Sequence, residues 1–195
     1  PDGGLPRGAQ AGRIKSKQEF EREKTVMKFM IKTKRLTIQP FSAAFLAPYY
    51  KEFTAEITKY QYPDSFPDIH TADIVMSNFV KAMEHGDMLE LVILTHDGEF
   101  LGSMEAFDIS GKTPVLGLWL KSSAHGKGYG YEALKGLVDH LNATGRYLYY
   151  IYNVDIRNAA SIHLAEKFNY KKGETETTTT ESGKVLHTQT YYITG

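Results

Sequence analysis

The sequence predicts an α/β (α+β) fold in which a mixed, mostly antiparallel sheet contains one parallel strand pair. Asp97-Gly98 is a strong hairpin signal between two apolar runs, so antiparallel strands are expected in the middle of the chain. Residues 115–154 then read as strand, glycine-rich loop, helix and strand, an order that implies a parallel crossover. The last run of this unit, residues 147–154, is apolar on both faces, which is typical of a strand buried between layers.

Length and composition indicate an ordinary globular protein. The 195 residues suffice for one domain with its own core, and 42% hydrophobic with 24% charged residues is unexceptional. Lys plus Arg and Asp plus Glu both number 23, so nothing indicates a nucleic-acid-binding surface. The absence of cysteine excludes disulfides, thiolate metal sites and a catalytic thiol, and fits a cytoplasmic protein. No run approaches the roughly 18 apolar residues of a membrane span.

Residues 1–26 predict an N-terminal extension, either disordered or foreign to the natural protein, ahead of a single domain over residues 27–195. The extension is rich in Gly, Arg, Lys, Glu and Gln and shows no apolar periodicity. It also lacks the apolar core of a signal peptide. An extra helix over residues 17–28 is the alternative interpretation.

A strand and two helices are expected before the antiparallel strands. Residues 33–41 predict the strand, and Ser42 is a credible N-cap for a helix that ends near residue 53. Residues 71–85 predict the second helix because their apolar side chains recur at helical spacing. Two prolines punctuate residues 60–68, which predict a loop between the helices.

The rest of the chain supplies two more helices and six more strands, which brings the expected number of strands to seven. The chain closes with a hairpin whose threonine-rich first strand has high strand propensity. The strands are expected at residues 89–94, 100–109, 115–120, 147–154, 171–180 and 185–193, and the helices at residues 129–143 and 159–168.

The loop between the central strand and the following helix suits an anion. Gly126, Gly128 and Gly130 tolerate positive φ and let the backbone approach a ligand closely. The helix that follows offers unpaired N–H groups at the positive end of its dipole, and Lys127 adds a formal charge. The pattern favours a phosphate-binding loop over a tight turn with no ligand.

Two well-known phosphate loops fit this stretch poorly. The only Gly-Lys-Thr sequence begins at Gly111, and Ala106 stands where a Walker loop needs its first glycine. The segment from Gly128 to Ala133 matches G-x-G-x-x-A, with Asp155 downstream as a ribose partner. That fingerprint turns directly off its strand, however, whereas seven residues separate Leu120 from the first glycine here. A dinucleotide-binding oxidoreductase therefore stays a weaker alternative.

Two segments together resemble a known family. Residues 125–130 resemble the Q/R-x-x-G-x-G/A pyrophosphate loop of the GNAT family of acetyl-CoA-dependent N-acetyltransferases, with His125 at the Gln/Arg position. Residues 153–162 resemble the N-xx-N-xx-S segment of its RimJ/RimL-like branch, which includes ribosomal-protein N-terminal acetyltransferases. The resemblance extends from about residue 30 to the C-terminus. It implies the GNAT fold, a mixed, mostly antiparallel, seven-stranded sheet with a central parallel strand pair and helices on both faces.

The resemblance implies direct transfer of an acetyl group from acetyl-CoA to a primary amine within a ternary complex. No pair of histidines has the spacing of a metal site, so no catalytic metal is expected. The acceptor is a protein N-terminus or a small-molecule amine, and the loop over residues 60–68 closes over it, so that Tyr60, Tyr62 and Phe66 could line its pocket. Gly117 is consistent with a bulge that splays the central strand from its parallel neighbour. The residues expected to bind CoA are Leu118, Trp119, Leu120, His125, Gly126, Lys127, Gly128, Tyr129, Gly130, Asn153, Asn158 and Ser161.

The catalytic groups are less well defined by the resemblance. The tyrosine that many GNAT enzymes use to protonate the leaving thiolate aligns with Ala165, so Ser161 with Asn158 is expected to serve the sulfur instead. The glutamate of the histone-modifying branch aligns with Pro114, which cannot act as a base. Glu105 is the best remaining candidate for the base. The reserve candidates are Asp108, His187 and Glu181.

A second alternative keeps the fold but not the reaction. A catalytically degenerate CoA-binding module would also lack the usual tyrosine and a certain base. Neither nucleic acid nor membrane is expected as a partner, and the closing hairpin could pair two copies into a homodimer.

Overall fold

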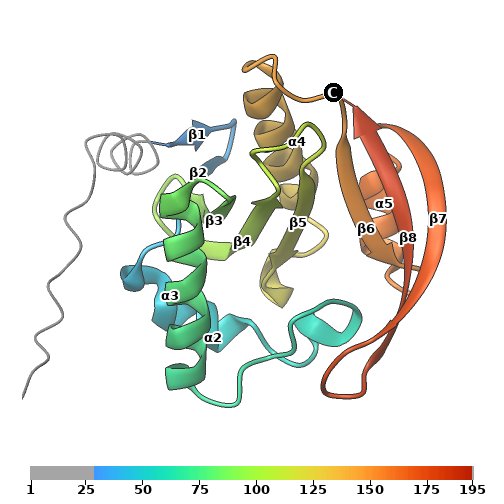
Figure 1. The fold of residues 1–195 in the computed structure, drawn as a ribbon. Helices are drawn as coiled ribbons and strands as arrows, with labels where there is room; N and C mark the ends of the chain where they lie inside the picture. Colours follow the sequence, from blue (N-terminus) through green and yellow to red (C-terminus); the bar gives the residue numbers. More distant parts are fainter. Residues whose placement is uncertain (1–28, 195) are drawn as a thin grey trace, which may run out of the picture.

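The computed structural model describes residues 29–194, and the predicted extension over residues 1–26 lies outside them. The described chain forms one eight-stranded sheet in the order β1-β2-β3-β4-β5-β6-β8-β7 (Figure 1). Only β5 and β6 are parallel, as expected. The strands are β1 Ile31–Lys32, β2 Leu36–Pro40, β3 Met88–Thr95, β4 Phe100–Phe107, β5 Val115–Leu120, β6 Tyr150–Asp155, β7 Asn169–Thr179 and β8 Val185–Thr194.

The expected number of seven strands is one too few. The additional strand, β1, is two residues long and pairs antiparallel with β2 at the edge of the sheet. A two-residue strand cannot display an alternating pattern, so the sequence gives no signal for it. The other seven strands correspond to the predicted ones, with ends displaced by a few residues.

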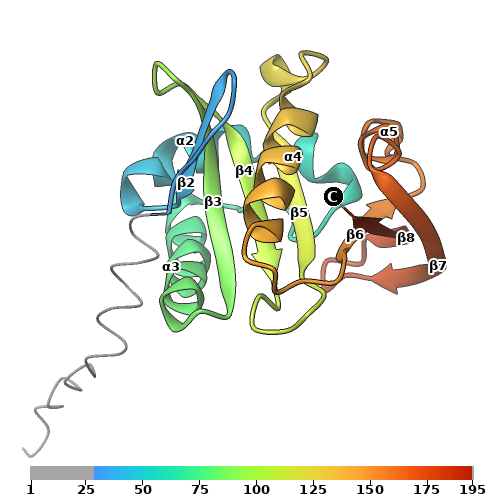
Figure 2. The same cartoon turned by 90° about the horizontal axis from the view of Figure 1, so that it is seen from above.

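Helices cover both faces of the sheet, as the family resemblance implies (Figures 1 and 2). The helix α3 begins at Ile69, two residues earlier than predicted, because the Asp68 side chain accepts a hydrogen bond from the Thr71 N–H at 2.7 Å. Ser42 precedes a short 3-10 turn and makes no side-chain capping bond. The helical segments are η1 Ala43–Phe45, α2 Leu46–Glu52, η2 Ile57–Tyr60, α3 Ile69–His85, η3 Ser122–Ala124, α4 Tyr129–Asn142 and α5 Ala159–Ala165.

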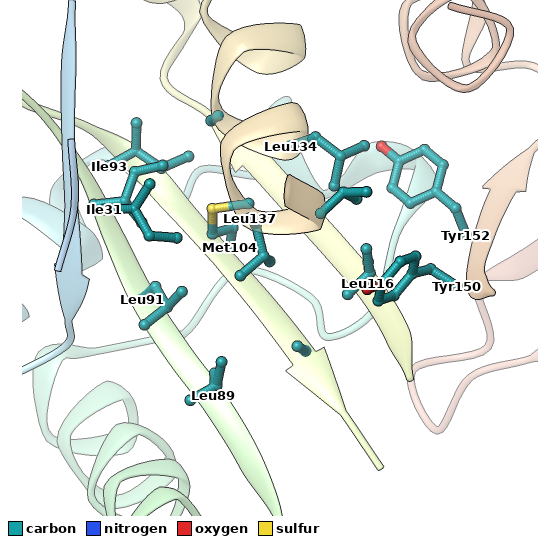
Figure 3. Packing of buried hydrophobic residues seen from close by; sticks show 14 of the residues in the cluster. Ile31, Leu89, Leu91, Ile93, Met104, Leu116, Leu134, Leu137, Tyr150 and Tyr152 are labelled. Carbon is teal, nitrogen blue, oxygen red and sulfur yellow. The ribbon is translucent and has the colours of Figure 1, made fainter. Parts of the chain in front are cut away.

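Two cores form on opposite faces of the sheet. On one face, Leu137 of α4 lies beside Met104 of the sheet, Leu134 points toward Tyr152 (Figure 3), and all four side chains are buried. The other face packs against α2 and α3 through a cluster rich in aromatic side chains. That cluster consists of Phe41, Tyr49, Phe53, Met76, Val92, Leu94, Phe100 and Trp119.

The parallel pair at the centre of the sheet is short. β5 and β6 pair at Val115 with Ile151 and at Leu116 with Tyr152, and beyond these positions they are no longer in register. The rest of β5 remains fully paired with β4 on its other side. The strands therefore diverge from Gly117 onward, which leaves an opening in the middle of the sheet. No helix of the described residues is both long and apolar enough to cross a membrane.

Candidate active site

The glycine loop joins the end of β5 to the first turn of α4. Gly126 and Gly128 adopt φ values of 72° and 78°, a left-handed conformation that favours glycine, and Gly128 is the N-cap of α4. The His125 ring donates from Nε2 to the Leu120 carbonyl at 2.8 Å, which ties the loop to the end of the strand. The backbone thus presents the unpaired N–H groups of a 14-residue helix to a ligand.

The turn between β1 and β2 braces this loop from outside. Arg35 donates from Nη1 to the Lys127 carbonyl at 2.9 Å and from Nε to the Glu132 carboxylate at 2.6 Å. Its guanidinium also stacks over the Tyr129 ring, 4.5 Å from the centroid. Thr33 donates to the same glutamate at 2.6 Å. The loop is therefore held by a segment more than ninety positions away in the sequence.

Two cavities meet at the opening between β5 and β6. The larger, about 440 Å³, lies between the end of β5, the glycine loop and α5. The smaller, about 260 Å³, lies against β4, β5, β6 and β8, beneath the loop that follows α2. Both are lined by Tyr60, Gln61, Leu118, Trp119, Tyr152, Asn158 and Ser161. A molecule in one cavity could therefore contact a molecule in the other through the opened sheet.

Glu105 lies in the wall of the smaller cavity, half-buried, and burial raises the pKa of its carboxyl to about 7. Across the sheet it stands between Glu90 on β3 and Gly117 on β5. β5 separates from β6 at Gly117, as expected, but no bulge interrupts the continuous pairing of β5 with β4 on the other side. The glycine instead makes room, since a Cβ there would lie 2.6 Å from the Glu105 Oε2 atom.

Glu90 is a buried acid that sequence reasoning missed. It is 0% exposed, and burial followed by the charge of Glu105 raises its pKa well above the usual range. Its Oε1 atom lies 2.6 Å from the Ser103 hydroxyl, while its Oε2 atom has no partner among the described residues. The available signal was a single acid inside the apolar run of β3.

At the other side of the opening, the N-terminus of α5 presents Asn158 and Ser161 to both cavities. The Asn158 Oδ1 atom caps the helix by accepting from the Ser161 N–H at 3.2 Å. Ala165, at the position of the usual tyrosine, is fully buried. A different tyrosine, Tyr152, projects from β6 toward Leu134 of α4 (Figure 3) and lines both cavities. Burial raises its pKa to about 12, and interaction with the Ser161 side chain opposes that rise.

Comparison with known families decides the identity of this architecture. Residues 35–171 match the family described as the acetyltransferase (GNAT) domain. The chain belongs to the GNAT family of acetyltransferases. The sequence by itself is not significantly similar to any of the curated proteins with which it was compared.

Solved structures with the same fold include members of the RimJ/RimL-like branch. RimJ of Mycobacterium smegmatis, in complex with CoA-disulfide, superposes with a TM-score of 0.72 at 17% identity, over 84% of this chain and 86% of that one. An acetyltransferase of Salmonella typhimurium that modifies the N-terminal serine of ribosomal protein L7/L12 gives 0.69 at 16% identity, over 86% and 100%. Spermidine N-acetyltransferase of Vibrio cholerae, with CoA and spermine, gives 0.70 at 13%, over 81% and 94%.

The acetyltransferase places most of its predicted CoA-binding residues around the larger cavity. Three lie elsewhere. Lys127 and Tyr129 face the Arg35 brace, and Asn153 lines only the smaller cavity, where it accepts a hydrogen bond from Thr190 at 2.9 Å. The residues that do line the larger cavity are Leu118, Trp119, Leu120, His125, Gly126, Gly128, Gly130, Asn158 and Ser161.

The structure distinguishes the four candidates for the general base by their positions relative to the two cavities. Of the four, Glu105 alone lines either of the two cavities in the described part of the acetyltransferase. His187 interacts through Nδ1 with the Thr177 hydroxyl at 2.9 Å on the closing hairpin. Asp108 follows the end of β4 with a φ of 56°, and Glu181 lies in the exposed hairpin turn. Nowhere in residues 29–194 do three metal-binding side chains gather.

The loop over the smaller cavity is fastened to the closing hairpin. Lys184, in the hairpin turn, donates to the carbonyl oxygens of Thr58 at 2.9 Å and Gln61 at 2.6 Å and pairs with the Asp64 carboxylate. Ser182 donates to the same carboxylate. Tyr60 and Tyr62 of this loop line the cavity, as expected, whereas the expected Phe66 packs on Tyr49 and Phe53.

Proposed function

We propose that this acetyltransferase binds acetyl-CoA in the larger cavity and a primary amine in the smaller one, and transfers the acetyl group directly between them. The observation that supports this most strongly is the meeting of the two cavities at the opening between β5 and β6. Direct transfer also suits a chain that contains no cysteine to carry an acetyl group.

The first step is loss of a proton from the amine. An alkylamine is protonated at neutral pH, with a pKa near 10.4 for a lysine-like amine, so attack requires a base. Glu105 has a pKa of about 7, which leaves it partly ionised at neutral pH and able to accept a proton. The carboxylate takes one proton from the ammonium group, which frees the nitrogen lone pair to attack the thioester carbon.

The second requirement is stabilisation of negative charge on the thioester oxygen. The backbone of β5 beyond Leu116 has no strand partner on the side of β6. Its free N–H groups, around Leu118 to Leu120, would donate to that oxygen as the tetrahedral centre forms. Fixed backbone donors of this kind need no rearrangement during the reaction.

The last step breaks the carbon–sulfur bond and releases CoA as a thiolate, which takes the second proton that the amine nitrogen loses as the amide forms. Ser161 and Asn158 line both cavities and would hydrogen-bond the sulfur. No step of this scheme requires a metal.

Pairing of two copies into a homodimer through the closing hairpin stays a prediction. The exposure of β7 along almost its whole length is compatible with it.

The test is an assay of free CoA release from acetyl-CoA in the presence of a panel of amines. Glu105→Gln should lower kcat by about 10²- to 10⁴-fold, the usual contribution of general acid–base catalysis. Its affinity for acetyl-CoA should be unchanged, because the carboxylate lies in the other cavity. Full activity in Glu105→Gln would exclude this residue as the base, and absence of CoA release with every amine would contradict the proposed function.

A further inference from the structure

We infer that the acceptor is a small primary amine that carries one positive charge on a short chain attached to an aromatic or similarly flat apolar group. The inference rests on the proposed function, because it assigns the acceptor of the same reaction. Three properties of the smaller cavity support it: the count of its charges, the nature of its walls and the way in which it is closed.

Two acids, Glu105 and Asp155, line the cavity, and Asp155 has no free lone pair with which to bind a ligand amine. The Asp155 carboxylate has about four lone pairs and accepts four hydrogen bonds: from the Arg157 guanidinium at 2.7 and 2.6 Å, from the Arg157 N–H at 3.0 Å and from the His187 N–H at 2.9 Å. Its side chain is 0% exposed. A ligand amine therefore cannot use Asp155 without breaking this network.

Glu90, which stands opposite Glu105 on the neighbouring strand β3, is protonated and therefore neutral. The geometry of its hydrogen bond with Ser103 is the reason. The Ser103 Oγ atom lies 2.6 Å from both the Glu90 Oε1 atom and the Leu91 carbonyl oxygen. A serine hydroxyl carries one hydrogen, and a carbonyl can only accept. Ser103 must then donate to Leu91, so the hydrogen in the other contact belongs to Glu90. A protonated Glu90 adds no charge to the cavity, and Glu105 is left as its single available negative charge.

The cavity also lacks cationic side chains. Among residues 29–194, no lysine or arginine lines it, so nothing is placed to bind a carboxylate or phosphate on the acceptor. Two cations that contact residues of the cavity wall are engaged in other interactions. Lys184 binds the loop through Asp64 and two carbonyl groups, and Arg157 pairs with Asp155 and stacks over Tyr60 at 5.2 Å. One negative charge matches one ammonium group, and a polyamine would leave its other charges unpaired.

Aromatic rings form much of the cavity wall. Phe53 and Trp119 lie 5.0 Å apart between centroids, and Phe79 meets Phe107 edge to face at 6.4 Å. Tyr60 completes this wall from the loop. Such rings favour a flat apolar group by stacking and attract a nearby cation through their faces. The wall therefore fits an aryl group better than the polar backbone of a peptide.

The closure of the cavity limits the size of the acceptor. Its volume of about 260 Å³ is small for a ligand site. Lys184 and Ser182 fasten the overlying loop to the hairpin through Asp64. A polypeptide acceptor would have to displace this fastening, whereas a small amine would not.

The experiment measures CoA release by the purified full chain with four acceptors: 2-phenylethylamine, n-butylamine, spermidine and a short peptide with a free N-terminal serine. We expect kcat/KM for 2-phenylethylamine to exceed that for the others by roughly 10-fold or more, the scale on which apolar contacts discriminate. Preference for spermidine or the peptide would overturn the inference while leaving acetyl transfer intact. Absence of turnover with all four would overturn the inference together with the proposed function.

A matched pair of variants tests the aromatic wall itself. Phe107 is 38% exposed, so Phe107→Ala should fold. We expect it to raise KM for 2-phenylethylamine by about 10-fold and to change KM for n-butylamine far less. Leu148→Ala, which removes a 70% exposed side chain outside both cavities, should change neither. An equal rise in KM for both amines in Phe107→Ala would contradict an aryl-binding wall.

Discussion

Glu105 and Gly117 stand opposite each other on β4 and β5, and the missing side chain of the glycine is what admits the carboxylate to the cavity. A Cβ at residue 117 would lie 2.6 Å from Oε2, well inside the roughly 3.5 Å at which nonbonded atoms settle. The position of the proposed base therefore depends on a neighbour that carries no functional group.

Gly117→Ala should accordingly impair catalysis more than folding. The added methyl group must push the Glu105 carboxylate aside, and a displacement of about 1 Å can cost on the order of 10²-fold in rate. Steady-state kinetics should show a fall in kcat with acetyl-CoA affinity and unfolding midpoint nearly unchanged. If kcat stays at the wild-type value, the carboxylate does not act from this position.

The pH dependence of the reaction should report the pKa of Glu105. Because burial raises that pKa to about 7, kcat/KM should rise as pH increases through this value and the carboxyl loses its proton. Glu105→Gln should lose the inflection near pH 7 and rise only at higher pH, where the amine loses its proton without the help of a base. The same inflection in both proteins would assign it to another group.

Because Glu105 is buried, ionisation of its carboxyl group should lower the free energy of unfolding at pH values above its pKa in the unfolded chain. Its folded pKa of about 7 exceeds the ordinary value of 4.5, so the native state holds this proton more tightly than the unfolded chain does. Stability is then lost as pH rises from 4.5 towards 7. Glu105→Gln should thus gain free energy of unfolding over the wild type at pH 8 but not at pH 5, as measured by urea titration. Parallel behaviour of the two proteins at both pH values would contradict this account.

Arg35 should contribute to CoA affinity without touching the ligand cavity. Arg35→Ala removes the bond to the Lys127 carbonyl and the ion pair with Glu132, which together brace the glycine loop. We expect the Kd for acetyl-CoA to rise about 10-fold, the equivalent of one charge-assisted hydrogen bond of ~1.5 kcal/mol.

The control for this variant is Lys135→Ala, which breaks an exposed pair with Asp139 on the same helix. Such surface pairs contribute little, so its Kd should match the wild type. Calorimetric titration with acetyl-CoA compares the two variants directly. Equal affinities in Arg35→Ala and Lys135→Ala would show that the brace is not needed.

The succession of strands along the chain and the position of the glycine loop could be predicted because local sequence patterns indicate both. Gly126 and Gly128 adopt the left-handed conformations that their residue type favours. The side chains that α4 buries include Leu134, Leu137, Val138 and Leu141, which recur at the helical period of 3.6 residues. The short edge strand β1 escaped prediction because two residues carry no period.

The chemistry of the site depended instead on register, which local patterns do not encode. The row formed by Glu90, Glu105 and Gly117 exists only because three strands pair in one alignment. The brace from Arg35 to Lys127 likewise joins residues 92 positions apart. Tyr152 looked like an ordinary core residue of an apolar strand, and only the divergence of β5 from β6 brings it to both cavities.

The most direct test of direct transfer is a single-turnover experiment with enzyme in excess over acetyl-CoA, performed with and without 2-phenylethylamine. CoA release is measured over time, and both the protein and the amine are analysed by mass spectrometry. Direct transfer between the two cavities predicts that CoA appears only with the amine, that the amine gains one acetyl group and that the protein mass never changes. Release of CoA without amine, accompanied by an acetylated protein, would contradict it.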